Sequence, residues 1–67
     1  METKLWPDST SIARTSYNAV NQILEVETKK GKIYRYKGFP STAWEETKNA
    51  ESIGRHMHAK IINQYEY

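Results

Sequence analysis

The sequence predicts an α+β fold, in which a three-stranded antiparallel β-meander is followed by two short helices packed on one face of the sheet. Three observations support this prediction. Residues 24–37 alternate between apolar and polar side chains around an internal glycine, which is typical of a β-hairpin. Residues 12–17 favour a strand ahead of this hairpin. After it, Ile53, Met57 and Ile61 recur at four-residue spacing, as on a helix with one buried stripe.

The chain of 67 residues is long enough for one domain with a small core. We expect residues 1–8 to form a poorly ordered N-terminal arm and residues 9–67 to form the domain. Trp6 is expected to fold back onto this domain, because a large aromatic ring gains from burial. The sequence has no cysteine, no signal-peptide pattern and no run of about 20 apolar residues, so we expect a cytoplasmic protein without a membrane partner.

The register of the hairpin follows from its loop. If residues 29–31 form the loop, Gly31 takes the left-handed position of a G1 bulge, where a residue without Cβ is not strained. The expected cross-strand pairs are Leu24–Tyr36, Val26–Tyr34 and Thr28–Lys32 on one face, and Ile23–Lys37, Glu25–Arg35 and Glu27–Ile33 on the other. A two-residue loop would mix apolar and charged side chains on both faces, because a one-residue slip inverts every position. Residues 18–22 favour a turn that leads into the hairpin.

Pro40 marks the end of the sheet, since proline cannot donate to a ladder of hydrogen bonds. A first helix is predicted to begin at Ser41 or Thr42 and to end at about Lys48. Thr42 has a glutamate three residues further on, which is the spacing of a capping box. Trp44 is predicted to anchor this helix in the core.

Residues 49–51 interrupt the helical pattern, and Ser52 is a suitable N-cap for a second helix that ends near Asn63. The apolar stripe of this helix is predicted to face the sheet, with Gly54 beside it. Because glycine costs a helix about 1 kcal/mol relative to alanine, a close approach of the backbone to the sheet or to a ligand would explain Gly54.

The order of these landmarks resembles that of the KTSC domain, a small module named for its occurrence at the C-terminus of some lysyl-tRNA synthetases and also found as a free-standing bacterial protein. The resemblance spans about Ser11 to Tyr65. The residues that carry it are Ser16-Tyr17, Leu24-x-Val26, Gly31, Tyr34-x-Tyr36, Pro40, Trp44, Ala50-x-Ser52-x-Gly54, Ile61 and Tyr65. Thr28 and residues 56–58 depart from the family pattern, in which Phe and an aromatic-Phe-Asn run are common at these places. The resemblance implies an α+β fold. Because the module occurs in a tRNA-charging enzyme, the resemblance also implies an RNA-binding role.

Basic residues cluster in the hairpin. The net charge is only +2, yet five of the ten basic residues lie between positions 29 and 37 with no acid among them. Together with two basic residues of the second helix, they are the candidate phosphate contacts of a nucleic-acid-binding surface: Lys29, Lys30, Lys32, Arg35, Lys37, Arg55 and Lys60. The alternative is that these charges keep a sheet edge soluble and pair with Glu25 across the hairpin.

Tyr34 and Tyr36 are candidates for a platform on which bases stack. The register places both tyrosines on the face that carries the apolar pairs, so the alternative is that they belong to the core. A small pocket for a nucleotide or phosphate between these tyrosines and Gly54 is a lesser alternative. His56 and His58 point about 200° apart on a helix and so cannot share a metal ion. His58 is predicted to be half-buried and His56 exposed, and either could add positive charge to an anion site.

No constellation of nucleophile, base and orienting group is evident in the sequence, so we expect a protein that is not an enzyme and that uses neither a cofactor nor a metal. The expected function is therefore that of a small binding module with RNA as its partner. The alternative is a protein-interaction module, or a homodimer joined through an exposed edge of the sheet.

Overall fold

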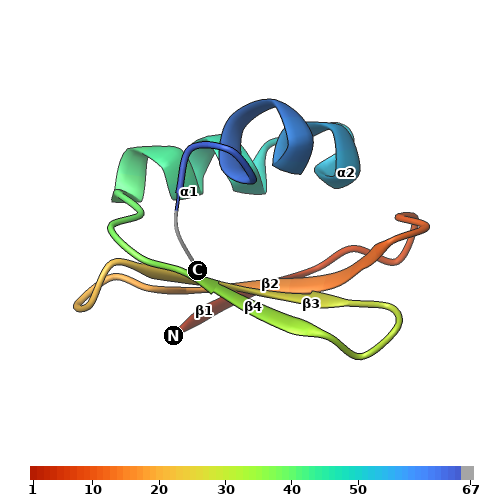
Figure 1. Cartoon of the computed structure of the whole chain (residues 1–67), viewed down its shortest axis with the longest axis horizontal. Coiled ribbons are helices and arrows are strands. Elements are labelled where there is room, and N and C mark those ends of the chain that lie inside the picture. Colours follow the sequence, from red (N-terminus) through yellow and green to blue (C-terminus); the bar gives the residue numbers. More distant parts are fainter. Residues whose placement is uncertain (66–67) are drawn as a thin grey trace.

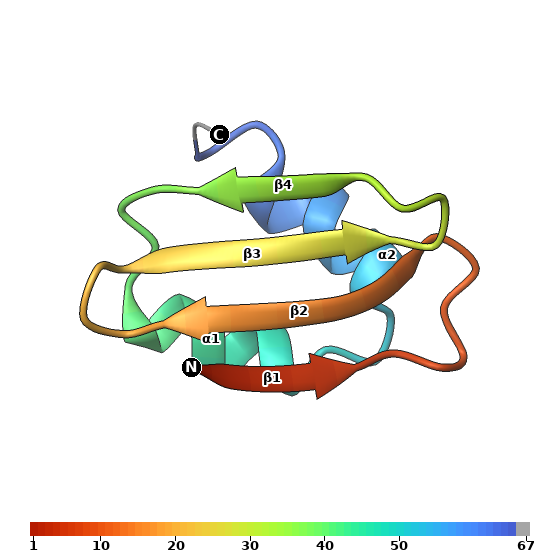
Figure 2. The ribbon, with the colours of Figure 1, turned by 90° about the horizontal axis from the view of Figure 1, so that it is seen from below.

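Four antiparallel strands form a single sheet, and the helical segments cover one of its faces (Figure 1). The structure is a computed structural model of the chain and describes residues 1–65. Its elements are β1 (Glu2–Leu5), β2 (Ile12–Asn18), β3 (Ile23–Thr28), β4 (Ile33–Tyr36), α1 (Ser41–Lys48), α2 (Ile53–His56) and the π-helical turn η1 (Met57–Ile61). The strands lie side by side in chain order (Figure 2). The α+β prediction is confirmed, with a sheet of four strands and not three.

The additional strand is β1, which lies in the segment expected to be a poorly ordered arm. It pairs along its whole length with β2, from Glu2 opposite Tyr17 to Leu5 opposite Arg14. The alternation pattern could not reveal β1, because all four of its side chains are exposed. Trp6 folds back as expected: it is buried, and its indole Nε1 donates to Oγ1 of Thr15 at 2.9 Å. The strand is thus held by backbone pairing and by the tryptophan that follows it.

The hairpin of β3 and β4 has the expected register. Leu24 pairs with Tyr36 and Glu25 with Arg35, and the pairing continues to Glu27 opposite Ile33. The loop is closed by two backbone hydrogen bonds, from Thr28 N to Lys32 O at 2.8 Å and from Gly31 N to Thr28 O at 3.0 Å. Gly31 has a φ of +90°, so the residue that the pattern placed in the left-handed region is there.

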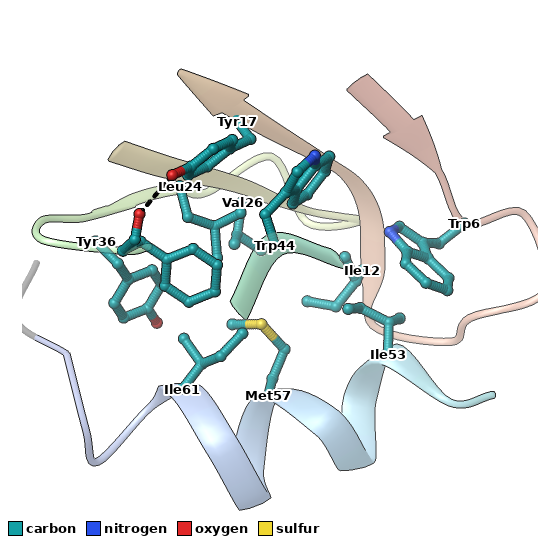
Figure 3. Close-up of a cluster of buried hydrophobic side chains, with 11 residues drawn as sticks. Trp6, Ile12, Tyr17, Leu24, Val26, Tyr36, Trp44, Ile53, Met57 and Ile61 are labelled. Atoms are coloured by element: carbon teal, nitrogen blue, oxygen red, sulfur yellow. Dashed lines mark hydrogen bonds between the residues drawn. The ribbon is translucent and has the colours of Figure 1, made fainter. Parts of the chain in front are cut away.

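The core lies between the sheet and the helices, and Figure 3 shows its side chains converging from both layers. Its most buried members are Leu24, Val26, Phe39, Ile53 and Ile61. Tyr17 and Trp44 stack with ring centroids 5.5 Å apart. The Tyr17 hydroxyl donates to the carbonyl of Phe39 at 2.7 Å, so this buried polar atom has a partner. Trp44 therefore anchors α1 in the core, as predicted.

The first helix begins differently from the prediction. Pro40 occupies the N-cap position with an extended backbone, and no side chain caps the helix. The expected capping box of Thr42 and Glu45 is not formed, because α1 begins at Ser41 and Thr42 already lies within its first turn. Extended proline leads directly into a helix, since its fixed φ is compatible with both conformations. The end of α1 at Lys48 agrees with the prediction.

The second helical segment has the predicted cap, because Ser52 accepts a hydrogen bond from the backbone of Arg55. Its stripe of Ile53, Met57 and Ile61 is buried against the sheet, as expected. After four α-helical residues the chain widens into η1, where Ile62 N donates to Met57 O at 2.8 Å. Within residues 1–65, no helix has the length and apolar character to cross a bilayer.

Candidate nucleic-acid interface

A groove runs between the hairpin and the second helical segment, on the helix-covered side of the sheet. One part has a volume of about 270 Å³, and most of its exposed lining is apolar. Its walls include Val26, Tyr34 and Tyr36 from the strands and Met57 and Ile62 from the helical side. Tyr36 is buried, whereas Tyr34 is half-buried. Tyr36 thus belongs to the core, in agreement with the core alternative, while Tyr34 lies between the core and the surface.

A second, neighbouring hollow lies at the tip of the hairpin and has a volume of about 370 Å³. Its lining includes the lysines Lys29, Lys30 and Lys32. Both parts share Tyr34, together with the hydroxyl-bearing side chains Ser11 and Thr28. We call the two parts together the hairpin groove, with an apolar end beside the helix and a basic end at the hairpin tip.

The lysines at the basic end are exposed, and none of them forms an ion pair with a residue of the described chain 1–65. Lys29 is the most restrained, because its Nζ donates to the carbonyl of Pro7 at 3.2 Å. Lys30 and Lys32 extend into solvent. Within the part of the chain that the structure describes, the positive charge at this tip is therefore not paired with a carboxylate.

The uncovered face of the sheet has a different electrostatic character. Arg14 contacts Glu27 at 2.6 Å and Glu25 at 3.0 Å, and Arg35 contacts the second oxygen of Glu25 at 2.9 Å. Arg14 and then Arg35 hold the pKa of Glu25 below its usual value against the opposing effect of burial. Two arginines and two glutamates cancel, so this face offers little net charge to a phosphate. Arg35 points away from the helices, as the register predicted, but it is paired.

The remaining candidate cations lie elsewhere. Lys37 is exposed just beyond the end of β4, at the opposite end of that strand from the hairpin loop. Arg55 and Lys60 line a separate hollow of about 310 Å³ together with His56. The structure therefore brings Lys29, Lys30 and Lys32 together with Tyr34, and it does not bring the basic residues of the second helix to the same groove.

The two histidines exchange the roles that the sequence suggested. His56 is half-buried, with its Nε2 at 3.1 Å from Oγ1 of Thr47. Because the Thr47 hydroxyl donates to the carbonyl of Ala43 at 2.7 Å, it is left to accept from His56, which assigns the proton to Nε2. Burial lowers the pKa of His56. His58 is exposed at the rim of the hairpin groove. The prediction failed because it considered only the sheet as a packing partner, whereas α1 packs beside His56.

Gly54 lines the apolar end of the hairpin groove, but the fold does not require a glycine there. A Cβ added to Gly54 would meet only the Ser11 Oγ, at 3.6 Å, which is an ordinary contact distance. The expected close approach of the backbone to the sheet is thus not present.

Sequence reasoning missed Ser11, Thr28 and Ile62 as groove residues. Of these three residues, only Thr28 was indicated by the sequence, because its predicted pairing with Lys32 placed it on the helix-covered face.

Metal ligation finds no support in the described part of the chain. Among residues 1–65, no three His, Asp or Glu side chains gather closely enough to hold a metal ion. The groove instead combines an apolar wall, three lysines and a few hydroxyl groups. Such a combination suits an organic anion with a flat apolar part.

Comparison with known proteins identifies one family for most of the chain. The family model of the KTSC domain matches residues 8–65. An uncharacterised protein of Stutzerimonas stutzeri strain A1501 is 38% identical over 57 residues, which cover 85% of this chain and 80% of that protein. The crystal structure of the KTSC domain protein YPO2434 from Yersinia pestis matches with a TM-score of 0.85 and 26% identity, over 97% of this chain and 93% of that chain. The chain therefore belongs to the KTSC domain family.

Proposed function

We propose that this KTSC domain is a non-enzymatic module that binds RNA through the hairpin groove. The observation that carries the proposal is the cluster of Lys29, Lys30 and Lys32, which lies beside a half-buried tyrosine and has no carboxylate partner in the described chain. Ammonium groups on flexible side chains contact phosphates without regard to sequence, and their affinity comes largely from the release of counterions. The occurrence of similar modules at the C-terminus of some lysyl-tRNA synthetases also favours RNA as the ligand.

The position of the other cations limits the proposal to the hairpin tip. Arg35 is held by Glu25, and Arg55 and Lys60 lie on a different side of the second helix. A ligand in the hairpin groove would therefore be held by the hairpin lysines, with the basic residues of the helix contributing only at long range. At physiological ionic strength, charges farther away than about 8 Å are largely screened.

Two charge-matched double variants test this proposal. Lys30→Ala/Lys32→Ala removes two charges from the groove, and Arg55→Ala/Lys60→Ala removes two charges from the other side of the helix. Binding of a single-stranded ribo-oligonucleotide is measured by fluorescence anisotropy at salt concentrations from about 50 to 200 mM. We expect the hairpin double variant to reduce the slope of log affinity against log salt by about 1.4, since each lost contact to a single strand contributes about 0.7.

The matched variant should change this slope much less. Equal losses in both variants would show that only total charge matters. The absence of any binding at the lowest salt concentration would remove the proposal altogether.

A second candidate is self-association through an exposed edge of the sheet, formed by β1 or by β4. These two edge strands carry the apolar residues Leu5 and Ile33, which are 68% and 46% exposed on the side of the sheet that the helices leave uncovered. Edge strands with exposed apolar residues favour pairing with another chain. Sedimentation equilibrium of the wild type and of Leu5→Thr/Ile33→Thr tests this candidate, because a dimer formed here should dissociate in the double variant. A wild type that stays monomeric at high concentration contradicts it.

A further inference from the structure

We infer that the hairpin groove accommodates a single unpaired nucleotide, with its base at the apolar end and its phosphate at the basic end. This inference deepens the proposed function and rests on it. The two ends of the groove meet at Tyr34, which lines both of them. A nucleotide has the same two-part chemistry, a flat apolar base joined through a sugar to an anion.

The dimensions and lining of the apolar end favour a base. Its volume of about 270 Å³ lies just below the range of about 300 to 1,000 Å³ that is usual for drug-sized ligands, so it suits one ring system and little more. Tyr34 supplies an aromatic ring on one wall, and aromatic rings stack with any base. The Ser11 and Thr28 side chains and the imidazole of His58 lie in the same lining and can reach polar atoms on the edge of a base.

Gly54 is compatible with a ligand at this place. Glycine is disfavoured in a helix, and this one is neither in the left-handed region nor pressed against the sheet. Since an added Cβ would meet only Ser11 at 3.6 Å, packing within the protein does not explain the glycine. A ligand that lies against the backbone of α2 would account for it, because a side chain here would project into the space beside Ser11. This space borders the hairpin groove and also a hollow of about 510 Å³ lined by residues of β1 and the turn that follows it.

A groove that takes up one unpaired base would bind single-stranded RNA in preference to double-stranded RNA. A base in a duplex is stacked and paired, and it would have to leave the helix before it could enter the groove. Phosphate contacts alone would not make this distinction, because both forms of RNA present phosphates. A preference for the single strand therefore reports on the apolar end, whereas salt dependence reports on the basic end.

The test compares a four-nucleotide RNA with a blunt duplex at equal salt, using wild-type protein and two pairs of variants. Gly54→Ala and Gly54→Leu introduce side chains of increasing size at the groove wall. Tyr34→Ala removes the stacking ring, and Tyr34→Phe retains it. Loss of one stacked base corresponds to a weakening of roughly five- to 150-fold. We expect Gly54→Leu and Tyr34→Ala to weaken single-strand binding by at least about fivefold, Gly54→Ala to weaken it less than Gly54→Leu, and Tyr34→Phe to retain the affinity that Tyr34→Ala loses.

A second measurement does not depend on these variants. Adenosine 5′-monophosphate added to the wild-type protein should shift the amide signals of Ser11, Gly54 and Tyr34 in a saturable manner. Equal affinity for single strand and duplex, without these shifts, would overturn the inference and leave salt-dependent binding by the lysines in place. Failure to bind any RNA would instead overturn the proposed function as well. The circular dichroism of each variant identifies one that does not fold, and the nucleotide titration then decides.

Discussion

The Trp6 indole allows a direct test of how the first strand is held to the sheet. Its Nε1 donates to Oγ1 of Thr15 at 2.9 Å, and Thr15 is completely buried. Trp6→Phe keeps most of the ring but leaves the Thr15 hydroxyl without its donor. A buried polar group that loses its partner costs about 1 to 3 kcal/mol. A domain of 67 residues has a total stability of roughly 3 to 10 kcal/mol, so this loss is a large fraction of the whole.

The control is Thr15→Val, which removes the hydroxyl with little change in shape. In the double variant Trp6→Phe/Thr15→Val no unpaired hydroxyl remains, so we expect it to be more stable than Trp6→Phe alone by about 1 kcal/mol. Urea unfolding followed by circular dichroism gives the free energy of each variant, provided that the m-value stays constant. A loss below about 0.5 kcal/mol in Trp6→Phe, or no recovery in the double variant, would refute this account of Trp6.

Three further predictions concern the loop, the uncovered face and a buried histidine. Gly31→Ala should lower the free energy of unfolding by about 1 to 2 kcal/mol in urea titrations, because a φ of +90° disfavours any residue with a Cβ and nothing lies within 4 Å of the added atom. Glu25→Gln should cost about 1 to 2 kcal/mol and more than Glu27→Gln, since Glu25 binds two arginines and its side chain is only 13% exposed. Because burial lowers the pKa of His56, the folded state binds this proton less readily than the unfolded state. Stability should therefore be constant above the ordinary pKa of 6.5 and fall as the pH decreases below it, with a smaller fall in His56→Gln. Thermal unfolding at a series of pH values measures this, and an equal fall in both proteins would contradict the assignment.

The hairpin was predictable because two independent signals agree there. The alternation from Leu24 to Tyr36 sets which side chains face the core, and Gly31 sets the loop length that preserves the alternation. The stripe from Ile53 to Ile61 was predictable for the same reason, since a buried helical face repeats at nearly four residues.

Other features depend on partners that alternation does not encode. β1 has four exposed side chains, so it carries no apolar pattern. It is defined by its backbone pairing, by Trp6 and by the polar contacts of Glu2 with Lys48 and of Thr3 with Ser16. His56 is covered by α1, an element whose position relative to the second helix could not be read from either helix alone. The candidate site was predictable only in part. The lysines and tyrosines stand out in the sequence, whereas Ser11 and Ile62 become groove residues through the arrangement of the layers.

The wide turn η1 ends where two successive isoleucines enter different environments, the first in the core and the second in the groove. Successive side chains of an α-helix point about 100° apart, so two adjacent residues rarely face the same side of the helix. A π-helical turn has more residues per revolution than an α-helical turn. Here Ile61 lies in the core and is 1% exposed, while the next residue, Ile62, already lines the groove. A substitution at position 62 would therefore change the lining of the proposed binding groove, while Ile61 keeps its place in the core.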